Sequence, residues 1–162
     1  MPVSTRTAEH RTLRFDSFAE VRRDLDALEA AQRAGTLRTT GNWTPGQIFT
    51  HLAAFIDNGF DGYPPQLNPP FFVKWFLRMK KREFLARGLP RGVKIPRIQG
   101  GTVGMEDVPF DEGLVRLRGA LDRLEASPPT HDSPGFGPMP HADVIGFACR
   151  HCELHLGYVH PR

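Results

Sequence analysis

Residues 151–155, HCELH, are the most informative stretch of this chain, and they lie in a predicted helix that starts near Pro140 and ends at about Tyr158. His151 and His155 are four residues apart, so a helix places both imidazoles on one face, close enough to hold one metal ion. The predicted inner stripe of this helix comprises Val144, Ala148, His151, His155 and Tyr158. The pattern predicts an all-α protein with histidines in its core.

An earlier helix supplies a third inward histidine. Thr44 is a good N-cap, Pro45 suits the first helical position, and Gln47 completes a capping box with Thr44. The helix is expected to fade by Gly59 or Gly62. Its apolar face comprises Ile48, His51, Leu52 and Phe55. His51 is therefore expected to point toward the same core as the histidines of the last helix.

Two further helices have clear core stripes. The first opens with a predicted capping box, Ser17 with Glu20, and stops at Gly35. Its apolar residues at helical spacing are Phe18, Val21, Leu25 and Leu28. The second carries Leu114, Leu117, Leu121 and Leu124.

An additional helical stretch, from about Pro70 to Arg87, lies in the chain between the helix that carries His51 and the helix that carries Leu114. One of its faces carries Phe72, Trp75, Phe76 and Met79. A Gly- and Pro-rich stretch follows at 88–108, and another connector spans 127–140; no β pattern is longer than a few residues. The sequence therefore predicts a four-helix bundle with one long crossover.

Three inward histidines favour a metal site. Three neutral imidazoles buried without partners would strand several polar nitrogens, at about 1–3 kcal/mol each. A divalent ion uses those lone pairs, and three protein ligands leave an open position for water or substrate, as in catalytic zinc sites. We predict His51, His151 and His155 as metal ligands. Imidazole suits zinc, nickel, copper or iron, and the alternative is that the three are core residues.

The other histidines are weaker candidates. His10 and His160 lie near the termini, His131 and His141 flank the Pro-rich connector, and His141 is nearly three turns from His151. Gln47, one turn before His51, could orient a ligand, although its capping role explains it equally well.

Cys149 and Cys152 form a C-x-x-C spacing in the middle of the predicted helix. Redox motifs of this kind gain thiolate character at a helix N-terminus, so packing is the favoured role here. On a helical wheel Cys149 points away from the histidine pair, and Glu153 is expected to be solvated. Two cysteines are too few for a disulfide scaffold.

Length and composition fit one domain over residues 1–162. The hydrophobic content of 40% and charged content of 24% are ordinary for a soluble globular protein. No apolar run reaches the roughly 20 residues of a membrane span, and residues 1–14 lack an apolar signal core. We therefore expect a cytoplasmic protein with no membrane partner.

The net charge of +3 hides an asymmetry. Nine of the 21 basic residues lie between Lys74 and Arg97, where Glu83 is the only acidic residue, so the rest of the chain is acidic. A solvated surface is the favoured explanation of this basic segment, ahead of a site for an anionic small molecule; nucleic acid is the least favoured partner.

Two stretches carry a resemblance to a known family. Residues 42–48, NWTPGQI, followed by His51-Leu52-Ala53, resemble the start of the metal-bearing second helix of the DinB/YfiT-like superfamily. Residues 136–139, FGPM, followed by 151–156, resemble the lead-in and the last-helix H-x-x-x-H of that superfamily. The resemblance covers about residues 12–159 and is closest to an uncharacterised DinB-like branch.

The resemblance implies an up-down-down-up four-helix bundle, usually a homodimer. It also implies a divalent metal, often nickel or zinc, held by residues that match His51, His151 and His155. Characterised relatives are metal-dependent transferases of low-molecular-weight thiols, such as bacillithiol and mycothiol, or isomerases that use such a thiol. The basic segment and the lack of a recognisable substrate motif depart from the family pattern.

Three functional hypotheses follow. In the first, a divalent ion lowers the pKa of a thiol or water, which attacks an electrophile in the bundle mouth, and the basic segment holds a substrate carboxylate or phosphate. The second is a metal-binding or stress-response module without turnover. The third is a basic interaction protein with core histidines, which predicts salt-sensitive binding to nucleic acid.

Overall fold

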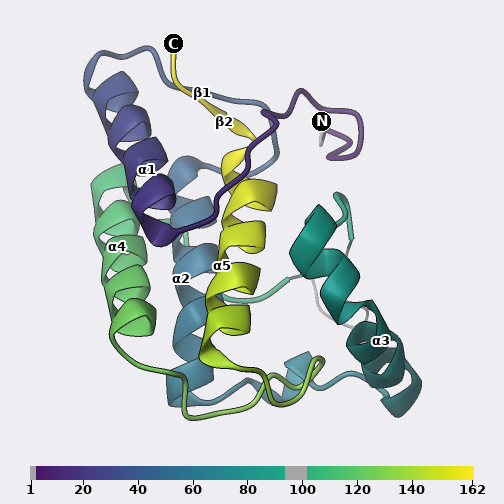
Figure 1. The fold of residues 1–162 in the computed structure, drawn as a ribbon. Helices are drawn as coiled ribbons and strands as arrows, with labels where there is room; N and C mark the ends of the chain where they lie inside the picture. Colours follow the sequence, from purple (N-terminus) through teal and green to yellow (C-terminus); the bar gives the residue numbers. More distant parts are fainter. Residues whose placement is uncertain (1–2, 94–101) are drawn as a thin grey trace.

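The computed structural model describes residues 3–93 and 102–162. This part of the chain is mostly helical, with five α-helices, one short 3-10 helix and one two-stranded sheet (Figure 1). The elements in chain order are α1 (Phe18–Arg33), β1 (Arg38–Thr39), α2 (Pro45–Asp61), η1 (Pro65–Leu67), α3 (Phe71–Arg87), α4 (Phe110–Ala126), α5 (His141–Leu156) and β2 (Val159–His160). The prediction of an all-α protein is confirmed.

The start of α2 is fixed by the predicted capping box. The Thr44 hydroxyl accepts a hydrogen bond from the Gln47 amide at 3.2 Å, and Gln47 Oε1 accepts one from the Thr44 amide at 3.0 Å. Both orphan amides are thereby satisfied, and Pro45 occupies the first helical position. Gln47 thus has the capping role, and the box holds the residues before α2 in a defined conformation.

The predicted capping box of α1 is only half right. Ser17 Oγ accepts a hydrogen bond from the Glu20 amide at 3.4 Å, as expected. The Glu20 carboxylate, however, accepts from the Asp16 amide at 2.6 Å rather than from Ser17. Its side chain extends one residue further back, so it satisfies an amide that lies outside the helix.

Helices α1, α2, α4 and α5 lie side by side (Figure 1). Their buried apolar residues form one hydrophobic core. The approach of α2 and α4 is the closest, because glycines meet there: a Cβ added at Gly113 would lie 2.9 Å from the Gly46 carbonyl oxygen. The largest fully buried side chains are Phe18, Val21, Leu25, Leu28, Ile48, Phe49, Leu52, Leu117, Leu121, Leu124, Phe147 and Leu156. The predicted leucine stripe of α4 and the apolar stripe of α1 are confirmed as core.

Helix α3 stands apart from the other four helices (Figure 1). It confirms the predicted helical stretch, but none of its residues is buried. Its partly buried side contacts α5 and the connector before α5; Phe84, for example, meets Phe136 edge-on with ring centroids 6.3 Å apart. Part of the predicted excursion at 88–108, residues 94–101, lies outside the described residues.

The last helix ends at Leu156, two residues before the predicted end at Tyr158. The chain then forms β2, which pairs antiparallel with β1 in the register Arg38 with His160 and Thr39 with Val159. This small sheet joins the end of the chain to the segment between α1 and α2. None of the described helices is long and apolar enough to cross a membrane.

Candidate metal centre

The three predicted ligand residues meet in space. His51 lies in the middle of α2, and His151 and His155 lie one turn apart near the end of α5. Their ring centroids are 4.7–4.9 Å apart in every pairing, and the nitrogens offered by the three rings all lie within 4.8 Å of one another. The histidine cluster (His51, His151 and His155) is therefore a group that could hold a metal ion.

The shortest link in the histidine cluster joins two helices. His51 Nε2 and His151 Nε2 are 3.1 Å apart. Two nitrogens bound to one tetrahedral zinc ion lie about 3.3 Å apart, because each zinc–nitrogen bond is about 2.0–2.1 Å long. The backbone thus brings ligands from α2 and α5 to nearly the separation that one ion requires.

The orientation of the His51 ring is fixed from outside the cluster. His51 Nδ1 lies 2.9 Å from the Val103 carbonyl oxygen and 3.4 Å from the Thr102 hydroxyl. A carbonyl only accepts, so Nδ1 carries the proton and Nε2 presents its lone pair to the cluster. Metal-binding histidines are commonly held by such a hydrogen bond on the other nitrogen. The sequence offered no indication of Val103, which reaches His51 from a loop.

Aromatic side chains cover the histidine cluster. The Trp43 indole stacks on His155 with centroids 5.2 Å apart and an interplanar angle of 15°, and it meets His51 edge-on. Phe55, one turn after His51, meets His151 with centroids 4.4 Å apart. The i, i+4 spacing of His51 and Phe55 is the sequence signal that places Phe55 beside the histidine cluster. Trp43 precedes the N-cap of α2, so helical spacing gives no such signal for it.

Burial keeps the histidine cluster neutral. Desolvation lowers the pKa of His51, although the Val103 carbonyl works against this shift. Desolvation also lowers the pKa values of His151 and His155 well below the usual 6.5, and repulsion between the neighbouring histidines adds to the shift. Neutral imidazoles are the form that binds metal, so the environment favours the ligand state near neutral pH.

One fully buried nitrogen of the histidine cluster has no protein partner. His151 Nδ1 is buried and makes no hydrogen bond to any described residue. In one neutral tautomer, His151 Nε2 donates to His51 Nε2, and the lone pair of His151 Nδ1 has no partner. In the other tautomer, His151 Nδ1 carries the proton, and that N–H has no acceptor. A cluster of two buried imidazoles and one half-buried imidazole, with an unsatisfied nitrogen and a pre-oriented partner, fits a divalent ion.

The remaining histidines lie outside the cluster. His10 Nε2 is 2.9 Å from the Leu154 carbonyl oxygen, and His141 Nε2 is 2.6 Å from the Leu124 carbonyl oxygen. His160 is buried in β2, and His131 is exposed beside Thr130. None of these four histidines belongs to the group of residues that could hold the metal ion.

The two cysteines are free and buried. Burial raises the pKa of the Cys149 thiol to about 11, and it raises the pKa of Cys152 as well. Both thiols belong to the hydrophobic core, where a thiolate is disfavoured. These environments support the packing role predicted from their mid-helix position.

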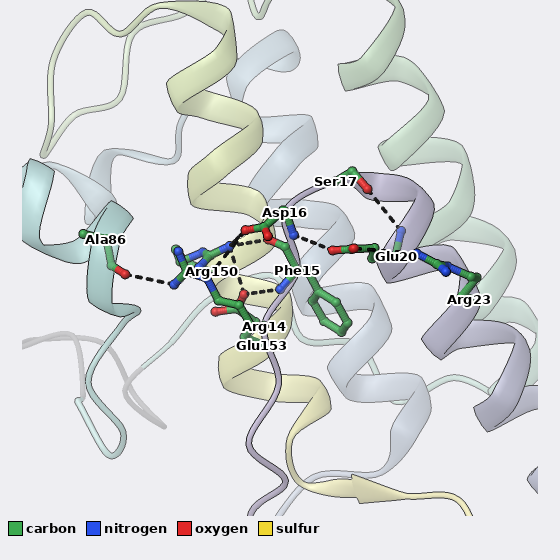
Figure 2. A network of polar contacts seen from close by, with 9 residues as sticks. All are labelled: Arg14, Phe15, Asp16, Ser17, Glu20, Arg23, Ala86, Arg150 and Glu153. Atoms are coloured by element: carbon green, nitrogen blue, oxygen red, sulfur yellow. Dashed lines mark hydrogen bonds and ion pairs between the residues drawn. The ribbon is translucent and has the colours of Figure 1, made fainter.

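The prediction that Glu153 is solvated is wrong. Glu153 is 8% exposed, and its carboxylate accepts a hydrogen bond from the Phe15 amide at 2.6 Å and lies 3.0 Å from the buried Arg150 guanidinium (Figure 2). Arg150 also donates to the Phe15 carbonyl. The segment before α1 crosses α5 here, so the face opposite the histidines is covered by chain rather than by water.

Two residues of the basic segment, Arg87 and Arg91, lie away from the histidine cluster. Arg87 and Arg91 line a hollow of about 280 Å³ with Arg150 and Glu153, on a different face of α5 from His151 and His155. Lys94 and Arg97 lie outside the described residues.

A family model described as "Protein of unknown function (DUF1569)" matches residues 7–162. The match extends over nearly the whole chain of 162 residues. A search of the curated proteins finds no match to the chain, and neither does a search of the solved structures. The family description names no activity and no metal.

Proposed function

The chain belongs to the DUF1569 family, and we propose that it is a divalent-metal-binding protein of the DinB-like type that transfers a low-molecular-weight thiol to an electrophile. The observation that carries the proposal is the convergence of His51, His151 and His155, whose nitrogens lie within 4.8 Å of one another. Zinc or nickel is the proposed ion, because neutral imidazoles suit both.

The proposal includes a bundle topology. Helices α1, α2, α4 and α5 form the up-down-down-up bundle of DinB-like proteins, and α3 belongs to the long crossover between α2 and α4. The side-by-side arrangement of these four helices in Figure 1 supports this topology. Facing helices of such bundles commonly supply inward metal ligands, which agrees with the origin of the histidines in α2 and α5.

The three histidines would hold the ion, and a bound divalent ion lowers the pKa of a thiol or water at its open position. The Val103 carbonyl keeps the His51 Nε2 lone pair directed inward. Trp43 and Phe55 shield the histidines from solvent. In the transfer, the thiolate sulfur forms a bond to the electrophilic carbon, the leaving group departs with the bonding electrons, and the thiol proton passes to solvent.

A second candidate is a metal-binding module without turnover. Two hollows of the described surface, of about 360 and 280 Å³, have no residue of the histidine cluster among their linings. A substrate cavity next to the ion would be expected of an enzyme. The position of these two hollows favours the non-catalytic module over an enzyme.

An activity assay separates these alternatives. Protein loaded with zinc or nickel is mixed with low-molecular-weight thiols and an alkyl-halide electrophile, and thioether formation is followed by mass spectrometry. The proposal predicts a metal-dependent product that His155→Ala abolishes and the exposed-site control His131→Ala retains. Metal binding without product would support the module, and absence of both would leave the histidines as core residues.

A further inference from the structure

Helix α3 exposes more bulky apolar surface than any other described helix. Its five exposed large apolar residues are Phe71 (82%), Phe72 (60%), Trp75 (64%), Phe76 (47%) and Met79 (57%). Single exposed apolar residues are normal on protein surfaces, but a contiguous patch marks an interaction site. The sequence correctly places four of these residues on one face, and the structure shows that this face is not core.

The five residues form one continuous strip. With 3.6 residues per turn, they fall within an arc of about 140° over the first nine residues of α3. The strip therefore runs along the exposed side of the helix rather than around it.

Cationic side chains border the strip on both sides. Arg78 lies next to it along one edge, with its guanidinium 3.1 Å from where a Cβ at Gly137 would be, and Lys80 and Arg87 lie along the other edge. The only acidic residue of α3, Glu83, is paired with Lys80 at 2.6 Å. A long basic side chain at the edge of an apolar face can bury its methylenes and keep its charge at a polar boundary.

The opposite side of α3 is held by the body of the protein. A Cβ at Gly135 would lie 2.8 Å from a Leu77 methyl, and one at Gly146 would lie 3.0 Å from a Leu85 methyl. Arg14 also donates to the Ala86 carbonyl at 2.9 Å (Figure 2). These contacts fix the rotation of α3 about its own axis, so the strip faces outward.

The charge of α3 indicates what covers the strip. Six lysines and arginines against one glutamate make the helix strongly cationic. Two copies of α3 packed strip to strip would bring these cations together, which disfavours self-association through this face. Aromatic residues flanked by Lys and Arg are typical of helices that lie in the interface of an anionic bilayer.

We propose that α3 is an interfacial helix that binds this protein peripherally to the surface of anionic lipid bilayers. Phe71, Phe72, Trp75, Phe76 and Met79 enter the boundary between headgroups and acyl chains. The basic residues that border the strip contact the lipid phosphates. Peripheral binding needs no membrane-spanning helix, so it revises our expectation of no membrane partner.

Co-sedimentation of the full chain with lipid vesicles tests this proposal. Vesicles of phosphatidylglycerol mixed with phosphatidylcholine should bind the protein, and pure phosphatidylcholine should bind it at least about tenfold more weakly. The double variant Phe72→Ser, Trp75→Ser should lose at least about tenfold in vesicle affinity. Val115→Ser removes an equally exposed apolar residue, 70% exposed on α4, and should bind like wild type.

Trp75 emission gives a second readout. In a Trp43→Phe background, the emission should shift to the blue when anionic vesicles are added, because the indole leaves water. Unchanged emission together with no sedimentation would overturn the proposal. Loss of a dimer in the double variant, or binding to single-stranded nucleic acid but not to vesicles, would overturn it in favour of those partners. Metal content of the double variant should equal that of wild type, so this test is independent of the proposed function.

Discussion

His51 Nε2 on α2 lies 3.1 Å from His151 Nε2 on α5, although the two residues are separated by 100 positions in the chain. The contact links α2, which packs closely on α4, to α5, the last helix of the protein. The geometry of the candidate metal centre therefore depends on how α2 and α5 are held, and the first predictions concern that support.

The glycine contact between α2 and α4 should be intolerant of a methyl group. Gly113→Ala should lower the free energy of unfolding by about 1–3 kcal/mol, because its Cβ would lie 2.9 Å from the Gly46 carbonyl and 3.2 Å from Phe49 Cβ. Gly119 lies in the same helix with open space around it, so Gly119→Ala should raise stability by up to about 1 kcal/mol. Urea unfolding measures both, and equal effects would contradict the close approach.

The buried carboxylate of Glu153 should stabilise the fold without serving the metal. Glu153→Ala leaves the Phe15 amide and the Arg150 guanidinium without this partner and should cost about 3–5 kcal/mol. The exposed pair of Arg22 and Glu125 provides the control: Glu125→Ala should cost less than about 1 kcal/mol. If the protein with Glu153→Ala stays folded, it should still bind metal in full; loss of metal from folded protein would contradict the separation of the two faces of α5.

The sequence identifies all five α-helices, and the reason is local. Thr44, Pro45 and Gln47 carry their own start signal, and the leucines of α4 recur at helical spacing. The histidine pair of α5 follows from the same periodicity. These features require no knowledge of the tertiary structure, which is why they survive comparison with it.

Features that depend on distant segments could not be predicted. Glu153 is buried because the backbone of Phe15 crosses over it, a contact across 138 positions. The Val103 carbonyl reaches His51 from an irregular loop, and no side-chain pattern encodes a carbonyl position. Likewise, the apolar face of α3 looks like a core stripe in sequence, and only its setting shows that it is exposed.

Trp43 should report metal binding. Its indole stacks on His155 and meets His51 edge-on, with centroids 5.2 Å apart in both cases. In the Trp75→Phe variant, Trp43 is the sole tryptophan, and added Ni²⁺ should quench its emission. In the Trp43→Phe variant the remaining emission should change little. Equal quenching in both variants would argue for ion binding elsewhere.

The stability of the metal-free protein should fall as pH is lowered from about 7.5 to about 5. The folded pKa values of His51, His151 and His155 lie below 6.5, so the unfolded chain takes up protons first as the pH falls, and this lowers its free energy relative to the folded state. Their stabilising contribution is complete above about pH 6.5 and is lost below it, with a slope of up to about 1.4 kcal/mol per pH unit for each histidine.

A single variant isolates this effect from other titrating groups. Burial raises the pKa of Glu153, which acts in the opposite direction, so the total slope alone is not diagnostic. Urea unfolding of His151→Gln beside wild type should show a shallower decline below about pH 6.5. Parallel curves would mean that His151 is not buried in its neutral form.

Metal content of untagged protein, measured by inductively coupled plasma mass spectrometry, shows whether the three histidines bind an ion. Wild type and His131→Ala should each retain roughly one zinc or nickel ion per chain, and His151→Ala should retain none. A wild-type protein that contains no metal and binds neither added zinc nor added nickel would contradict the proposed metal site. Retention of a full equivalent by His151→Ala would contradict the ligand assignment.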